Sequence, residues 1–222
     1  MSHAMLSSTR HLRLPVPGGS LAGELVIPDG ATGLVVFAHG SGSSHLSPRN
    51  QWVARWLETA NLGTFLFDLL TPAEEAVDAR TVSLRFDVEF LAVRLLQATE
   101  HLVSGRLAPD LRIGYFGAST GAAAALVAAA ERPDAIGAVV SRGGRPDLAG
   151  EALQRVEAPT LLIVGAADPE VLALNRAALG RLTCTKELLV VPRATHLFPE
   201  PGALEEVARR ACGWFTRHLA AR

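Results

Sequence analysis

The chain has 222 residues, of which 49% are hydrophobic and 19% charged, and its formal net charge at pH 7 is -1. This composition excludes a disordered chain, and the small net charge argues against nucleic acid or an anionic membrane as a partner. No apolar run approaches the roughly 20 residues of a membrane span, and the N-terminus lacks a signal-peptide core. We therefore expect a cytoplasmic protein with an N-terminal tail at residues 1–10 and a single domain at residues 11–222.

The N-terminal part of that domain has the pattern of a hairpin followed by buried strands. Leu12, Leu14 and Val16 alternate with polar neighbours, and a glycine-rich turn separates them from a second short strand at residues 21–28. The following strands are continuously apolar, as in a parallel sheet that is covered on both faces. These runs are expected at residues 34–40, 64–70, 112–118, 135–141, 160–166 and 187–192.

Segments with helical spacing separate these strands. Ser47 and Pro48 predict the start of a first helix, and Phe86, Phe90, Val93 and Leu96 mark a second. An alanine-rich segment ending near Pro133 predicts a third. The last helix has Leu204, Val207, Ala208, Ala211 and Phe215 as core-facing positions. Strands that alternate with helices predict an α/β fold, a doubly wound, mostly parallel sheet between helical layers, with the antiparallel hairpin at its N-terminal edge.

The most informative motif is Gly117-Ala118-Ser119-Thr120-Gly121, where a buried strand becomes a helix. Two functions fit this serine: a helix N-cap in an ordinary turn, or a nucleophile held on a sharp bend. Glycines on both sides favour the nucleophile, because a strained bend leaves no room for side chains there. The helix N-terminus would also stabilise a developing oxyanion.

A serine nucleophile needs a base and an orienting acid, which follow it in the order acid, then histidine. His196 follows a buried strand, whereas His218 lies near the C-terminus and is expected to be a solvated surface residue. Asp168 directly follows the preceding strand and is favoured as the acid. Asp147, six residues beyond an earlier strand, is the alternative and also fits a helix cap.

The second oxyanion donor is expected on the glycine-rich loop at residues 37–44. We assign the backbone N–H of Ser41 to this role beside that of Thr120, with Gly42 as the next choice. His39 precedes the serine and so falls outside the expected order. We interpret it as a residue that holds the loop by hydrogen bonds.

Taken in order, these segments resemble the α/β-hydrolase superfamily, and within it the dienelactone-hydrolase-like family. The runs "HGSGSSHLSPRN", "GYFGASTGAAAAL", "VVSRGGRPDLA" and "ATHLFPEPGALEEVA" are similar to bacterial hydrolase domains, some of which are fused to a phosphoribosyltransferase domain. The resemblance covers about residues 20–220. It implies Ser119 as nucleophile, His196 as base, Asp168 as acid, and Ser41 and Thr120 as oxyanion donors. Dienelactone hydrolases proper use a cysteine nucleophile, where this chain has Ser119.

The sequence also bears on the substrate. Only about 17 residues separate Ser141 from Pro159, too few for a cap domain. Arg142 and Arg145 follow a strand at the ligand-binding edge of the sheet, and either is a candidate anchor for a substrate carboxylate. A salt bridge from these arginines to Asp147 or Glu151 is the alternative.

We expect a serine hydrolase of carboxylic esters or lactones that needs no cofactor. A thioesterase, amidase or acyltransferase would use the same triad, and a non-catalytic binding module could keep the fold. The two cysteines, Cys184 and Cys212, make neither a disulfide framework nor a zinc site, so we expect buried structural thiols and no metal. The expected partner is a small ester. Whether the chain forms a homodimer stays open, and a separately encoded phosphoribosyltransferase partner is implied only by the resemblance.

Overall fold

Eight strands form one sheet in the computed structural model, which describes residues 9–105, 107–108 and 110–220. The expected tail falls mostly on residues 1–8, which lie outside the described residues. The strand order is β1-β2-β4-β3-β5-β6-β7-β8, with β1, β2 and β4 paired antiparallel and the remaining pairs parallel. The strands are β1 (Arg10–Val16), β2 (Gly19–Val26), β3 (Leu34–Ala38), β4 (Gly63–Phe67), β5 (Ile113–Ala118), β6 (Ile136–Arg142), β7 (Thr160–Gly165) and β8 (Lys186–Val191).

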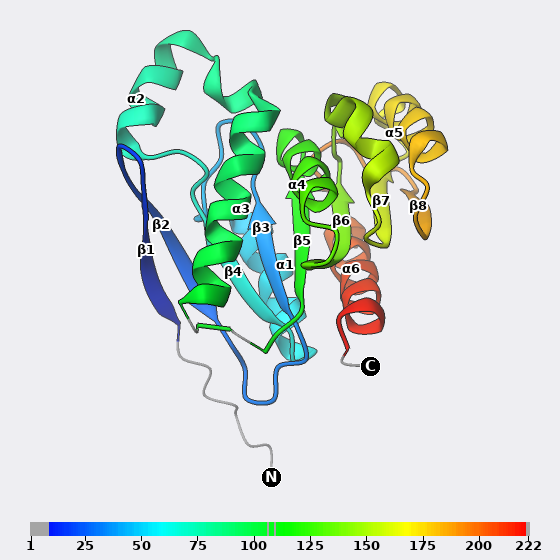
Figure 1. Cartoon of the computed structure of the whole chain (residues 1–222). Helices are drawn as coiled ribbons and strands as arrows, with labels where there is room; N and C mark the ends of the chain where they lie inside the picture. The colour runs from blue at the N-terminus through cyan, green and yellow to red at the C-terminus, as the bar shows by residue number, and fades with distance from the viewer. Residues whose placement is uncertain (1–8, 106, 109, 221–222) are drawn as a thin grey trace.

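Helices cover both faces of this sheet (Figure 1). They are α1 (Pro48–Thr59), α2 (Pro72–Thr81), α3 (Val88–Ser104), α4 (Thr120–Glu131), α5 (Pro169–Arg181) and α6 (Ala203–Leu219), with 3-10 helices η1 (Leu84–Phe86) and η2 (Pro146–Arg155). Two apolar clusters form the core: α3, α4, α5 and η2 pack on one face of the sheet, and α1 and α6 on the other. The doubly wound architecture and the N-terminal antiparallel hairpin are thereby confirmed.

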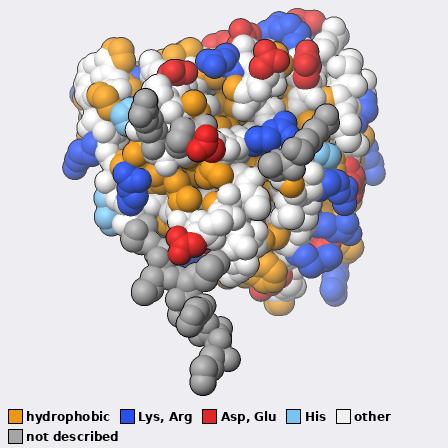
Figure 2. All heavy atoms as spheres, turned by 60° about the horizontal axis from the view of Figure 1, so that its bottom comes forward, with side chains coloured by type: hydrophobic (Ala, Val, Ile, Leu, Met, Phe, Trp, Pro, Cys, Tyr) orange, Lys and Arg blue, Asp and Glu red, His pale blue; other side chains and the backbone are white. Residues whose placement is uncertain are grey.

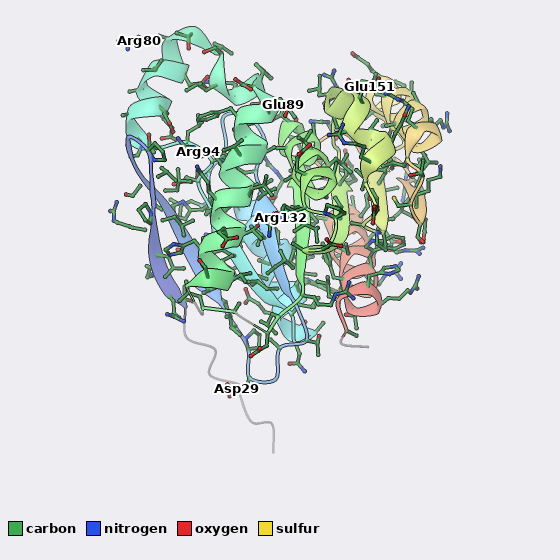
Figure 3. The ribbon with its side chains drawn as sticks, in the orientation of Figure 1. Asp29, Arg80, Glu89, Arg94, Arg132 and Glu151 are labelled. Atoms are coloured by element: carbon green, nitrogen blue, oxygen red, sulfur yellow. The ribbon has the colours of Figure 1, made fainter. Side chains whose placement is uncertain are left out.

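The sequence pattern missed α2. Its only buried residue is Asp78, so no apolar periodicity marks it. The helix begins at a capping box, in which the Thr71 side chain accepts from Glu74 N and the Glu74 carboxylate accepts from Thr71 N. The guanidinium of Arg94, on α3, pairs with Glu74 and so ties α2 to α3 (Figure 3).

Three other predictions need correction. On α3 the buried face contains Leu91, Leu95 and Leu102, whereas Phe86 lies before the helix and Val93 is exposed. The apolar residues of this segment fit more than one helical stripe, so their spacing did not identify the face in the core. Cys184 and Cys212 are free but half-buried.

The third correction concerns His218, which was expected to be a solvated surface residue. It is half-buried, because its ring centroid lies 4.6 Å from that of Trp214.

The surface shows no segregation of charge on the face in Figure 2, where basic and acidic side chains stand among apolar ones. Within the described ranges, no helix is long and apolar enough to cross a membrane.

Candidate active site

Ser119 occupies the bend between β5 and α4. Its backbone has φ 51° and ψ -123°, outside the region that L-residues ordinarily adopt, so the turn is strained. The residue stands at the N-cap of α4, yet its side chain makes no capping hydrogen bond. The geometry therefore disagrees with an ordinary serine cap and matches a bend that presents the hydroxyl.

The flanking glycines are required by close backbone contacts. A Cβ atom at Gly117 would lie 2.4 Å from Ala122 Cα, and one at Gly121 would lie 2.3 Å from Ala38 O. Both distances are far inside van der Waals contact, and the atoms they meet belong to the backbone. Helix α4 can therefore approach β5 and β3 this closely only with glycine at both positions.

His196 and Asp168 meet on neighbouring loops. The His196 Nδ1–H donates to Asp168 Oδ2 over 2.8 Å, with the carboxylate largely buried and the imidazole partly exposed. Asp168 follows β7 and His196 follows β8. A backbone hydrogen bond from Ala167 N to Ala194 O, 2.9 Å long, fixes the two loops to each other. This arrangement leaves Nε2 of His196 as the nitrogen available for proton transfer.

The loop after β6 contacts both Ser119 and His196. Arg145 N donates to Ser119 O over 3.0 Å, and a Cβ at Gly143 would lie 3.0 Å from His196 O. Asn175, buried on α5, donates from Nδ2 to Gly144 O over 2.9 Å and so holds this loop. Sequence reasoning missed Asn175; a polar residue among the apolar positions of α5 was the available signal.

Among the described residues, the Ser119 hydroxyl has no hydrogen-bond partner.

A cavity of about 440 Å³ opens beside the bend, and both assigned oxyanion donors, Ser41 and Thr120, line it. Its remaining wall combines leucines with polar side chains. The apolar members are Leu46, Leu69, Leu70 and Leu91, and the charged ones are Glu75, Asp78 and Arg85. Gly42, the second choice for the oxyanion donor, lines the same cavity with φ 70°.

His39 braces the loop after β3. Its Nδ1–H donates to Gly40 O over 2.9 Å, and its Nε2 accepts from Leu69 N over 3.1 Å. Burial lowers the pKa of His39, which keeps the ring neutral so that Nε2 can accept. These two bonds agree with the loop-holding role predicted for it. Nearby, His45 Nδ1 donates to Asp68 Oδ1 over 2.8 Å, a pair that the sequence did not reveal.

The two candidate anchor arginines differ in their contacts. Arg145 forms a bidentate pair with Asp147, with N···O distances of 2.9 and 2.8 Å, and this hydrogen bonding raises the pKa of Arg145. The structure thus brings Asp147 to Arg145 and Asp168 to His196. Arg142 is 7% exposed and pairs with no carboxylate among the described residues. No group of His, Cys, Asp or Glu side chains in the described ranges could hold a metal ion.

Comparison with known proteins gives close relatives. The chain is 56% identical to a solved dienelactone hydrolase from Anabaena variabilis, with a TM-score of 0.94 over 96% of this chain and 99% of that one. It is also similar in fold to the protein Est1E from Butyrivibrio proteoclasticus, at 15% identity and a TM-score of 0.78, over 94% of this chain and 98% of that one. No protein-family model matches the chain.

Two curated relatives have names that describe a transferase instead of a hydrolase. Two proteins from Mycobacterium tuberculosis, named as phosphoribosyl transferases, are 55% identical over 205 residues, which is 92% of this chain. The chain spans only 45% of the length of either relative. That partial match agrees with the fusion to a phosphoribosyltransferase that the family resemblance implied.

Proposed function

Because the chain belongs to the dienelactone-hydrolase-like family of the α/β-hydrolase superfamily, we propose that it is a serine hydrolase of carboxylic esters or lactones. The observation that carries the proposal is the strained backbone of Ser119, whose side chain caps nothing although it stands at the start of α4. A strained residue persists only where the surrounding structure enforces it, and such strain concentrates at functional sites.

In the proposed reaction Ser119 Oγ attacks the carbonyl carbon while its proton passes to His196 Nε2. The negative oxygen that forms is bound by the N–H groups of Ser41 and Thr120. His196 then gives the proton to the leaving oxygen, and the C–O bond breaks to leave an acyl group on Ser119. A water molecule then attacks the acyl carbon while His196 Nε2 takes its proton. The bond to Ser119 Oγ breaks, His196 gives the proton to Oγ, and the carboxylic acid is released.

Asp168 contributes by holding the imidazole. Its hydrogen bond to Nδ1 fixes the tautomer in which Nε2 is free to accept a proton, and its charge stabilises the imidazolium that forms. The carboxylate is largely buried, but the imidazole is partly exposed, so solvent screens part of this effect.

The test is covalent labelling with a fluorophosphonate, read by intact mass and located by peptide mapping. We expect one adduct per chain on Ser119 and none in the Ser119→Ala variant. Labelling elsewhere, or none in protein shown to be folded by circular dichroism, would contradict the proposal and favour a binding module that keeps the fold.

Thioesters, amides and acyl transfer pass through the same acyl-enzyme, so the triad does not separate them. Matched phenyl ester, thiophenyl ester and anilide substrates of one acyl group would rank them. We expect the phenyl ester to give a higher kcat/KM than the anilide, because phenolate is a better leaving group than the anilide nitrogen.

The name of the mycobacterial relatives raises a second activity. We propose that this region supplies hydrolysis and that a phosphoribosyltransferase would be a partner, either on the same chain or encoded separately. The purified chain should then release no pyrophosphate from phosphoribosyl pyrophosphate. Affinity capture that recovers no such transferase from a cell that encodes one would count against the partnership.

We also propose a cytoplasmic location, which the two free thiols support. Fractionation of the native host would test it, and recovery of the protein in an extracytoplasmic fraction would contradict it.

A further inference from the structure

The loop between β3 and α1, residues 39–47, contains the assigned oxyanion donor Ser41. The N–H groups of Ser41 and Gly42 donate to no acceptor among the described residues, and both residues line the cavity beside the bend at Ser119. Two glycines, Gly40 and Gly42, give this segment more conformational freedom than other residues would. An oxyanion site stabilises charge only when its donors are held in place before the reaction. The loop therefore needs anchors outside itself.

The end of β4 lies next to this loop and is itself fixed in the sheet. β3 and β4 are neighbouring parallel strands, with Phe37 opposite Leu66, so the residues that follow them reach the same edge. Asp68 directly follows β4, and its N–H donates to Ala22 O of β2 over 2.9 Å. A side chain at position 68 can therefore act as a fixed point for the loop.

Two histidines join the loop to this point. His39, at the start of the loop, accepts at Nε2 from Leu69 N over 3.1 Å. His45, near its end, donates to Asp68 Oδ1 from both its backbone N and its Nδ1, each over 2.8 Å. The side chains of His45 and Asp68 are largely buried, so solvent competes little for these bonds. Among the described residues, no other hydrogen bond joins residues 39–46 to a segment outside the loop.

The position of the loop also matters for the candidate nucleophile. A Cβ at Gly40 would lie 3.0 Å from Ser119 Cβ, so the loop passes directly against the bend. Ser41 follows Gly40 and stands between the two histidine anchors. A donor displaced by about 1 Å loses much of its effect on the transition state. Without the bonds to Asp68, residues 40–46 would be held only by their neighbours in the chain and by packing.

We propose that Asp68 and His45 are positioning residues for the oxyanion donor Ser41. The inference rests on the proposed hydrolase function and on Ser41 as a donor. Neither residue touches a reacting atom; both act through the backbone of the loop. One carboxylate oxygen accepts from the backbone and the ring of the same histidine, and hydrogen bonds to a charged acceptor are the stronger ones.

The test measures kcat/KM for 4-nitrophenyl acetate in a series of variants. Asp68→Ala removes the acceptor of both bonds and should lower kcat/KM at least about 10-fold, and at most by the roughly 10³-fold that loss of one oxyanion donor causes. His45→Ala should cost less, because its backbone N–H still reaches Asp68. Asp68→Asn should retain most of the activity, because its amide oxygen can accept the same two bonds.

Glu58→Ala is the matched control. Glu58 Oε1 accepts from Thr64 Oγ1 over 2.6 Å, a carboxylate bond at the other end of β4, and its loss should leave kcat/KM unchanged. Asp68→Asn also controls for charge, since burial and then the charge of Asp68 raise the pKa of Glu75, which lines the same cavity. Equal losses in Asp68→Asn and Asp68→Ala would assign the effect to that charge and overturn the positioning role.

A second readout separates positioning from stability. The Ser119 Oγ should add to the carbonyl carbon of 2,2,2-trifluoroacetophenone, with its proton passing to His196 and the carbonyl oxygen becoming the negative oxygen. In Asp68→Ala the inhibition constant should rise by about the factor by which kcat/KM falls, with both corrected to the folded fraction. An unchanged inhibition constant would overturn the proposal, because loss of stability alone changes only that fraction.

Hydrogen exchange of the peptide that contains residues 39–47 tests the anchor without any turnover. Exchange should be faster in Asp68→Ala than in the wild type, Asp68→Asn or Glu58→Ala. Unchanged exchange and unchanged kcat/KM in Asp68→Ala, in a protein that labels at Ser119, would overturn the positioning role and leave the hydrolase proposal standing. Wild-type protein that neither labels nor turns over an ester would overturn the hydrolase proposal, and exchange would still decide whether Asp68 orders the loop.

Discussion

Replacement of Asp168 by asparagine tests the pairing of Asp168 with His196, because it removes the negative charge and changes the shape of the side chain very little. The 2.8 Å hydrogen bond to His196 Nδ1 places a negative charge against the imidazolium that forms during catalysis. Two unit charges about 4 Å apart at an effective dielectric constant of about 20 interact by about 4 kcal/mol. The His196 side chain is 41% exposed, so we reduce this to about 2 kcal/mol, or roughly 30-fold in rate.

Asparagine has a second effect, because its amide N–H₂ can face Nδ1 and favour the wrong tautomer of the ring. We therefore expect Asp168→Asn to lower kcat/KM for an activated ester by at least about 30-fold and at most about 10⁴-fold. The rate of fluorophosphonate labelling should fall in parallel, since it depends on the same activation of Ser119.

Asp147→Asn is the matched control. Asp147 binds Arg145 at a partly exposed position, and such pairs contribute about 0 to 1 kcal/mol, so activity should change by less than about 5-fold. Circular dichroism would establish that both variants are folded. A larger loss in Asp147→Asn, or equal losses in the two, would refute the assignment of Asp168 and move the acid to the loop after β6.

Two further predictions concern the scaffold of the site. Gly121→Ala should lower the free energy of unfolding by about 3 kcal/mol or more, because its Cβ would lie 2.3 Å from Ala38 O. Gly213→Ala on α6, whose Cβ would meet nothing within 4 Å, should raise the free energy of unfolding by up to about 1 kcal/mol. Urea denaturation would measure both values, and equal effects of the two substitutions would contradict the packing argument. His39 has a pKa below its ordinary value of 6.5, so the unfolded chain binds more protons and stability should fall as pH drops below about 6.5. His39→Gln should flatten that slope by at most about 1.4 kcal/mol per pH unit, and an unchanged slope would show that His39 is not a source of it.

Much of the fold follows from local patterns that can be recognised in the sequence. Continuous apolar runs predicted the parallel strands, because a strand covered on both faces has no polar side. The run at β8 is the exception: this strand lies at the edge of the sheet and is mostly exposed or half-buried. Ser47 with Pro48 predicted the start of α1, where the Ser47 side chain does accept from Asn50 N. The bend at Ser119 was predictable for the same reason: a strand, two glycines and a small-residue helix are adjacent in the chain.

The sequence was less informative where a segment lacked a distinct apolar stripe. α2 buries only Asp78 and is marked by its capping box alone, a signal of two residues that periodicity does not detect. On α3 the spacing of Phe90 and Val93 indicated a helix but not which side faces the sheet. That choice depends on α4, which packs against α3 and is fixed elsewhere in the chain.

Some contacts of the candidate site could likewise be predicted from the sequence, and others could not. Chain order was enough to nominate Asp168 and His196, because parallel strands bring their carboxyl ends to one edge of the sheet. Only the tertiary structure decided what Arg142 and Arg145 bind. Arg145 meets Asp147 two residues away, whereas Arg142 faces Asn50, 92 residues earlier in the chain. Which side chains meet across a sheet depends on how helices pack on it, and no local pattern encodes the absence of a counterion there.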